Sequence, residues 1–291
     1  METQRANRHN ASLQRDGPQR GARFRQRLCL TILVLAALLG ATASAQAAAP
    51  DTVKGVRFGD HTTFERAVID LGPGNLSPDY SSSYREGDWV VRVKLPTVDS
   101  TLKTGGKGLG RAISRYYVVR TRNTAGGMFV DLHLTDAARS VRIFDLNDPA
   151  RIVVDVVPGG QLLYPSPAVG PRTVVMRPRA GTEVGPGSFV VSGYGRPFEA
   201  RGAWLIKDGS GNVVRRGMYA TGDWSAAWGA FGFTPGYPPT LSGHRGTLVV
   251  GAYSSRDGRF EGISIPLRFE QIRTVSRPVR EEQDDGEAQV E

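Results

Sequence analysis

Hydrophobic and polar residues alternate along most of the chain after residue 50, in short runs bounded by Gly, Pro, Asp or Asn. The run Trp89–Leu95 is typical: its residues are aliphatic, aromatic or charged, and every second one from Trp89 onward is apolar. A period of two turns one set of side chains toward a core and the other outward, as in a β-strand. Because no stretch shows the longer period of an amphipathic helix, the pattern predicts an all-β protein.

The runs fall into two groups, which predict two β-sandwich domains at residues 51–158 and 172–270. The stretch between them, residues 159–171, is rich in Pro and Gly and predicts a semi-extended linker. In the second group, turn signals such as Asp208–Asn212 recur about every 8–12 residues, which is typical of an immunoglobulin-like sandwich. The Cys…Trp…Cys signature of antibody domains is absent.

Residues 1–47 have the organisation of a leader and secretory signal peptide of the bacterial type. The cationic segment 20–27 precedes an apolar run, and small residues follow in the A-x-A patterns Ala43-Ser44-Ala45 and Ala45-Gln46-Ala47. These features predict a secreted, extracytoplasmic protein. The alternative is an uncleaved membrane anchor, since residues 28–45 carry no charge. The length of this segment is close to the lower limit for a membrane-spanning helix, which has roughly 17–25 residues.

Few side chains suited to catalysis or metal binding remain in the predicted mature chain. Cys29, the one cysteine, lies inside the apolar run of the signal, so cleavage would remove every thiol. His61, His133 and His244 lack the spacing of a zinc site, and no G-x-S-x-G or S-x-x-K motif is present. We therefore predict no enzymatic activity, no cofactor and no metal.

The first group of runs resembles the AMIN family of envelope-targeting domains. The resemblance rests on three segments: Val56-Arg57-Phe58, residues 64–71 and residues 148–156. It implies a β-sandwich that docks on peptidoglycan or another envelope component, without catalysis. The glycine-rich insertion 100–110 departs from the family pattern. Its segment Thr104–Arg111 fails the spacing of phosphate-binding loops and predicts a flexible cationic hairpin tip.

The second group resembles the immunoglobulin-like domain of bacterial spore germination. The following segments carry the resemblance: residues 177–184, 190–200, 207–209, 228–231, 248–258 and 265–269. It implies an accessory module of envelope proteins that binds carbohydrate or protein, and it implies no link to sporulation.

The charge of the chain, formally +9, is unevenly distributed. Seven arginines against Glu2 and Asp16 make the leader basic, and residues 271–291 form an acidic tail predicted to be disordered. The body between them is basic. A basic body suits an anionic polymer or surface, or serves solubility alone. No nucleic-acid recognition motif appears, so we expect no nucleic-acid partner.

Six residues are candidates for ligand contact. They are Arg57, Arg66, Arg92, Arg115, Trp224 and Tyr237. The arginines alternate with apolar residues and should line outward strand faces, where guanidinium groups can pair with carboxylates or phosphates. The two aromatic residues lie in turn-rich segments, where exposed rings could stack on sugars.

Other polar and aromatic residues are expected to be structural. Asp70, Asp131 and Asp155 lie near strand ends and should pair with neighbouring arginines rather than act as acid and base. Trp204 and Phe231 occupy strand positions and are expected in the core.

The sequence therefore predicts a secreted, non-catalytic protein of the cell envelope that binds peptidoglycan or another wall polymer. One alternative is a scaffold subunit of an envelope protein complex. A second is an accessory to a cell-wall hydrolase, or a cryptic hydrolase, although no catalytic domain's length of sequence remains unassigned. A membrane contact is expected only if the leader stays uncleaved.

Overall fold

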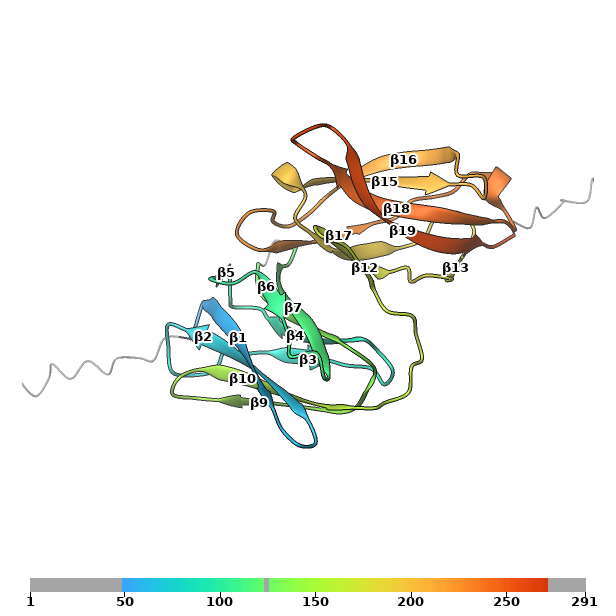
Figure 1. Ribbon diagram of the computed structural model, residues 1–291. Helices are drawn as coiled ribbons and strands as arrows, with labels where there is room; N and C mark the ends of the chain where they lie inside the picture. The colour runs from blue at the N-terminus through green and yellow to red at the C-terminus, as the bar shows by residue number, and fades with distance from the viewer. Residues whose placement is uncertain (1–48, 123–125, 272–291) are drawn as a thin grey trace, which may run out of the picture. The chain divides into compact units, whose positions relative to one another are not determined.

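The computed structural model describes residues 49–122 and 126–271, and within them the chain forms β-strands joined by turns and two short 3-10 helices (Figure 1). The predicted all-β class is confirmed. No helix within these ranges is long and apolar enough to cross a membrane. The predicted signal peptide, its alternative as an anchor and the acidic tail beyond Gln271 lie outside the described residues.

The first sandwich encloses a core between two sheets. One sheet has the order β5-β1-β2-β10-β9. Its strands are β1 (Thr52–Asp60), β2 (Glu65–Gly72), β5 (Ser100–Thr101), β9 (Ala138–Leu146) and β10 (Arg151–Pro158). The facing strands are β3 (Ser81–Ser83), β4 (Val90–Leu95), β6 (Gly105–Lys107), β7 (Ile113–Arg120) and β8 (Met128–Leu134). Fully buried residues such as Ile69, Val91 and Ile152 come from alternate strand positions, as the period of two predicts.

The second, immunoglobulin-like sandwich is built in the same way. Its outer sheet has the order β13-β19-β18-β15-β16. These strands are β13 (Glu183–Val184), β15 (Arg201–Lys207), β16 (Val213–Ala220), β18 (Arg245–Tyr253) and β19 (Phe260–Phe269). The facing strands are β11 (Ala168–Val169), β12 (Thr173–Arg177), β14 (Val191–Gly195) and β17 (Trp228–Phe233), and the 3-10 helices are η1 (Phe198–Ala200) and η2 (Pro239–Leu241). Trp204 and Phe231 lie in this core, which confirms their expected burial.

One sheet runs through both halves of the chain. Strand β17 pairs with β7 in parallel, with Trp228 opposite Val119, which gives the order β11-β12-β14-β17-β7-β8-β4-β3. A third apolar cluster covers this junction and is formed by Tyr117, Val119, Phe129, Val174, Tyr194 and Trp228. Backbone pairing and buried aromatic rings therefore join the two sandwiches, because an unpaired strand edge and an apolar sheet face are both costly in water.

The Pro/Gly stretch at residues 159–171 packs on both halves. The Trp89 indole donates a hydrogen bond to the Tyr164 carbonyl at 2.5 Å, and Arg179 donates one to the Pro165 carbonyl at 2.6 Å. Strand β11, which pairs with β12, also falls inside this stretch. These contacts attach the connection to the folded body along its length.

The glycine-rich insertion forms a hairpin, as predicted: β6 pairs with β7 in antiparallel fashion. Next to it, the buried carboxylate of Glu65 accepts hydrogen bonds from the backbone N–H groups of Leu109, Ala112 and Ile113, at 3.2, 2.7 and 3.1 Å. The chain's own carboxylate thus uses the amide groups that a phosphate-binding loop would offer to a ligand.

Candidate functional site

Two of the candidate arginines lie on the outward face of the first sandwich, but their guanidinium groups are already paired. Arg57 binds both oxygens of Asp70, at 2.5 and 2.8 Å, and Arg66 binds both oxygens of Asp155, at 2.6 and 2.8 Å. The expectation that these aspartates have arginine partners is confirmed. A ligand would have to compete with a bidentate intramolecular pair at each position.

The expectation that Arg92 lies on an outward face is wrong. Its guanidinium group binds both oxygens of the fully buried Asp131, each at 2.7 Å, and lies 3.9 Å from the centre of the Phe129 ring. This side chain projects from β4 toward Arg177, Arg179 and Ser192 of the second sandwich, which leave it half-buried, with 29% of its surface exposed. Arg115 is exposed, and its guanidinium group makes one long contact, 3.5 Å to the Tyr117 hydroxyl.

The expectation that Tyr237 lies at the surface is also wrong. Its ring is 5% exposed and packs against Phe269, with 4.8 Å between ring centres, while its hydroxyl donates to the Glu270 carbonyl at 3.0 Å. The Pro-Gly turn that carries Tyr237 folds back beneath the end of β19. The ring closes that end of the core, and its one polar atom finds a backbone partner, as buried tyrosines require.

Trp224 is exposed, as predicted, and its backbone is held firmly. It follows Asp223, whose Oδ1 accepts hydrogen bonds from the N–H groups of Trp224, Ser225 and Ala226. The other oxygen of Asp223 accepts from Arg120 at 2.9 Å. Burial alone would raise the pKa of Asp223, but these donors outweigh burial and lower it. The loop is therefore anchored by an ionised carboxylate, and the Trp224 ring, 40% exposed, extends from it.

The Trp224 ring meets Phe198, another exposed aromatic residue. Their ring centres are 5.3 Å apart with planes at 69°, an edge-to-face pair. Phe198 begins η1, where the next two residues have positive φ: Glu199 at 52° and Ala200 at 58°. Consecutive non-glycine residues in the left-handed region are strained, and such strain concentrates at functional sites.

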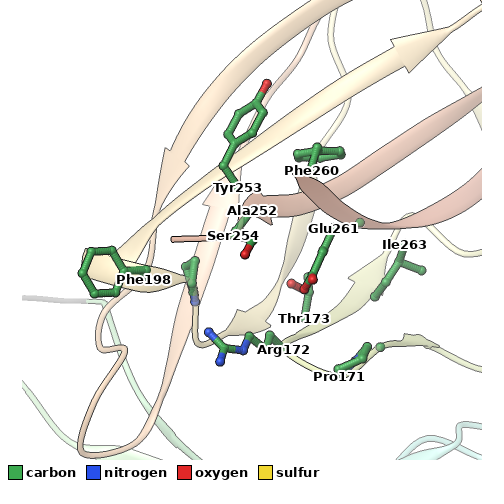
Figure 2. Close-up of a pocket in the computed structure, with 13 residues that line it drawn as sticks. Pro171, Arg172, Thr173, Phe198, Ala252, Tyr253, Ser254, Phe260, Glu261 and Ile263 are labelled. Carbon is green, nitrogen blue, oxygen red and sulfur yellow. The ribbon is translucent and has the colours of Figure 1, made fainter. Parts of the chain in front are cut away.

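These rings border two adjoining hollows at one end of the immunoglobulin-like sandwich, which we call the aromatic hollow. Its parts, of about 440 and 630 Å³, share Pro171, Arg172 and Phe198. The first part also has Tyr253 and Phe260, from the hairpin of β18 and β19, and Glu261; the second has Arg196, Trp224 and Trp228. Figure 2 shows the Arg172 guanidinium group and the Glu261 carboxylate pointing into the first part.

The charged groups of the aromatic hollow differ in whether they already have a hydrogen-bond partner within the protein. Arg196 donates to the carbonyls of Trp224 and Ser225, at 3.2 and 2.6 Å, and so supports the tryptophan loop. Within residues 49–122 and 126–271, neither the Arg172 guanidinium group nor the Glu261 carboxylate has a hydrogen-bond or ion-pair partner. Exposed rings beside unoccupied donors and acceptors suit a ligand with both apolar faces and polar edges.

The described part of the chain gathers no group of three or more His, Cys, Asp or Glu side chains that could hold a metal ion. The hollow offers aromatic surfaces for stacking, two arginines and one carboxylate, and groups of these kinds are suited to binding a ligand.

Sequence reasoning found Trp224 but missed the rest of the hollow. Arg172, Phe198, Tyr253, Phe260 and Glu261 come from segments separated by many residues, and no spacing connects them. One signal was present: Phe198-Glu199-Ala200 belongs to the segments quoted for the resemblance of the second half. An aromatic residue in a turn next to Pro197 is a surface candidate for the same reason as Trp224.

The strain at Ala200 leads to a testable prediction. We expect Ala200→Gly to raise the free energy of unfolding by about 0.5–1 kcal/mol, because glycine adopts positive φ without strain. Glycine also gives the unfolded chain more conformational entropy, which opposes folding, but the relief of strain is the larger effect. The matched control is Ala220→Gly in the exposed end of β16, where φ is negative and the change should cost about 0.5–1 kcal/mol. Urea unfolding measures the free energy of unfolding of the two variants. If Ala200→Gly destabilised the protein as Ala220→Gly does, the backbone at Ala200 would not be strained.

Comparison with known proteins supports the prediction that the second half is an immunoglobulin-like domain. Residues 173–259 match the family model described as the immunoglobulin-like domain of bacterial spore germination. This span contains Phe198, Trp224 and Tyr253 of the aromatic hollow. No curated protein and no solved structure matches the chain. The resemblance of residues 51–158 to AMIN-like domains stays a prediction.

Proposed function

We propose that this protein is a secreted, non-catalytic binding protein of the bacterial cell envelope, which docks on peptidoglycan or another wall polymer through the aromatic hollow. The observation that carries the proposal is the joint presence of exposed Trp224, Phe198 and Tyr253 with the unpaired Arg172 and Glu261. Sugar rings present apolar C–H faces to aromatic rings and hydroxyl, amide or carboxyl groups to charged side chains.

Two sequence features support the envelope as the location. The leader has the organisation of an export signal, and the first half resembles envelope-targeting AMIN-like domains. The basic body favours encounter with anionic polymers, because long-range attraction raises the local concentration of a charged partner.

We expect Trp224→Ala to weaken retention on purified peptidoglycan by about tenfold, since a lost stacking surface is worth roughly 1–2 kcal/mol. The measurement is a pull-down of the exported protein over a range of polymer concentrations, at low and at high salt. Retention that persists at high salt would support stacking over arginine attraction, because salt screens exposed charges.

The matched control is Met218→Ala, which removes an exposed apolar side chain from β16, outside the aromatic hollow, and should leave retention unchanged. Thermal unfolding checks that both variants fold. Equal losses in both variants would contradict the assignment of the hollow. Absence of retention by the parent protein at low salt would overturn wall binding itself and favour a scaffold role in an envelope complex.

A further inference from the structure

A second hollow, of about 330 Å³, lies between strands β3 and β4 of the first sandwich and strands β12 and β14 of the second, and four arginines line it. We call it the arginine hollow. Arg85 and Arg92 come from the first half, and Arg177 and Arg179 from the second. Neutral hydrogen-bonding groups also reach it, among them Ser83, Tyr84 and Ser192. Neither the family match nor the proposed wall-binding surface accounts for this concentration of cations.

Arg179 is the most informative residue of the arginine hollow. It is 4% exposed, and two of its nitrogens are occupied: Nη1 donates to the Pro165 carbonyl at 2.6 Å, and Nη2 donates to Asp88 at 2.5 Å. Its Nε is buried without any acceptor, and it is the one buried side-chain nitrogen or oxygen so placed in the described residues. A buried donor without an acceptor is destabilising, and it indicates a missing partner.

The charges around the arginine hollow do not balance. Four guanidinium groups face two carboxylates, Asp88 at its edge and Asp131 beneath Arg92. Arg177 donates only to the Met176 carbonyl, at 3.2 Å, and the contact of Arg85 with Asp88 is long, at 3.4 Å. Burial lowers the pKa of Arg179, and the neighbouring Arg177 and Arg85 lower it further. Arg179 is buried, Arg177 is half-buried and Arg85 is exposed, so the excess positive charge surrounds one buried cation. A buried cation with more cations than anions beside it is destabilising unless a further anion offsets the charge.

We propose that the arginine hollow binds a phosphate group, with Arg85, Arg177 and the free Nε of Arg179 as donors. The excess of positive charge suits a phosphate group, which carries about −1.5 to −2 as inorganic phosphate or a monoester near neutral pH and one negative charge as a diester within a polymer. Donors that come from several segments suit a tetrahedral oxyanion, whereas one guanidinium fork is enough for a planar carboxylate. The phosphate would be free or part of a phosphate-bearing envelope polymer, and its donors come from both sandwiches.

Bound phosphate should therefore stabilise the whole protein. We expect inorganic phosphate to raise the midpoint of thermal unfolding in a concentration-dependent manner, because a ligand that binds only the folded state adds to its stability. Sodium chloride at the same ionic strength and sodium acetate should have no comparable effect. Titration calorimetry with inorganic phosphate measures the affinity directly. An equal shift with acetate, or no heat and no shift with phosphate, would overturn the proposal.

The variant Arg177→Gln tests the assigned donors without disturbing the buried Arg179. It should weaken phosphate binding by about tenfold, as expected for loss of a charged hydrogen bond. The control Arg216→Gln removes the same charge from exposed β16, outside the arginine hollow, and should leave the affinity unchanged. Equal affinities in the two variants would overturn the site.

A competition with synthetic poly(glycerol phosphate) distinguishes the two sources of phosphate. Displacement of inorganic phosphate by the polymer supports a polymer-binding site, and failure of displacement supports a site for free phosphate. Because the assay contains no peptidoglycan and changes no residue of the aromatic hollow, its outcome is independent of the proposed wall binding.

Discussion

Asp131→Ala is expected to lower the free energy of unfolding by about 2–4 kcal/mol, because it leaves the half-buried Arg92 guanidinium group, whose side chain is 29% exposed, without its counter-ion. Asp131 is fully buried and accepts both guanidinium hydrogen bonds at 2.7 Å. Burial alone would lower the pKa of Arg92, but the Asp131 carboxylate outweighs burial and raises it. The pair lies beneath the junction of the two sandwiches, so its loss should loosen their attachment as well. Urea unfolding at neutral pH measures the change.

Asp70→Ala is the matched control for this prediction. Arg57 and Asp70 form the same two-pronged pair, but 63% of the Arg57 side chain is exposed. Water replaces the lost partner there, so the expected cost is about 0–1 kcal/mol. Similar losses in the two variants would show that burial does not decide the strength of these pairs. Replacing Arg92 and Asp131 together, by Met and Leu, should restore most of the lost stability, since no uncompensated charge remains.

Stability should also fall as the pH drops from neutral, because of His133. This residue is 4% exposed, its imidazole is hydrogen-bonded to the buried Tyr194 hydroxyl, and burial lowers its pKa to about 4. Asp131 on its own strand favours the imidazolium form, whereas Arg115 on β7, Arg92 on β4 and Arg179 beyond β12 oppose it. In the folded protein the imidazole is therefore neutral at the pH where a free histidine, with a pKa near 6.5, takes up a proton.

Acid lowers the stability because the unfolded chain takes up a proton more readily than the folded protein does. Between about pH 6.5 and pH 4, the unfolded state binds a proton at His133 that the folded state excludes, so acid favours unfolding. The pKa difference corresponds to a loss of about 2 kcal/mol between pH 7 and pH 5 and about 3 kcal/mol in total below pH 4. Urea unfolding at a series of pH values measures this slope. His133→Gln should flatten it across that window.

The exposed His244 supplies the control for this prediction. His133→Gln should change the slope more than His244→Gln does, because of these two histidines only His133 is buried. If His133→Gln retained the parent's slope, the buried imidazole would not be its source. Since His133 and Tyr194 belong to different sandwiches, acid should weaken the junction before either core unfolds.

The junction has a consequence for both proposed sites. Trp224 of the aromatic hollow stands on a loop whose Asp223 is paired with Arg120 of the first sandwich. The arginine hollow takes its donors from both halves. The two sandwiches therefore present their surfaces from one folded unit, in which a change at the junction reaches the loop that carries Trp224.

Sequence alone determined the parts of this protein that depend on local pattern. Alternation of apolar residues marked the long strands, since the faces of a strand repeat every two residues whatever it packs against. Asp208–Asn212 was expected as a turn, and Asp208 accepts hydrogen bonds there from Ser210 and Asn212. Their positions near strand ends also indicated that Asp70 and Asp155 would have arginine neighbours, although not which arginines.

The tertiary structure decided which of these faces meet water. Alternation cannot distinguish an outward face from one that another part of the fold covers, so Arg92 was expected at the surface although it is half-buried and paired with Asp131. A turn-rich segment does not show whether its side chains fold inward, so Tyr237 was expected at the surface although it is buried. The parallel pairing of β17 with β7 joins residues more than a hundred positions apart, and no local signal encodes it. Both hollows arise in the same way. Their side chains come from loops and strands that only long-range packing brings together, so the chemistry of binding depends on the arrangement of the sheets.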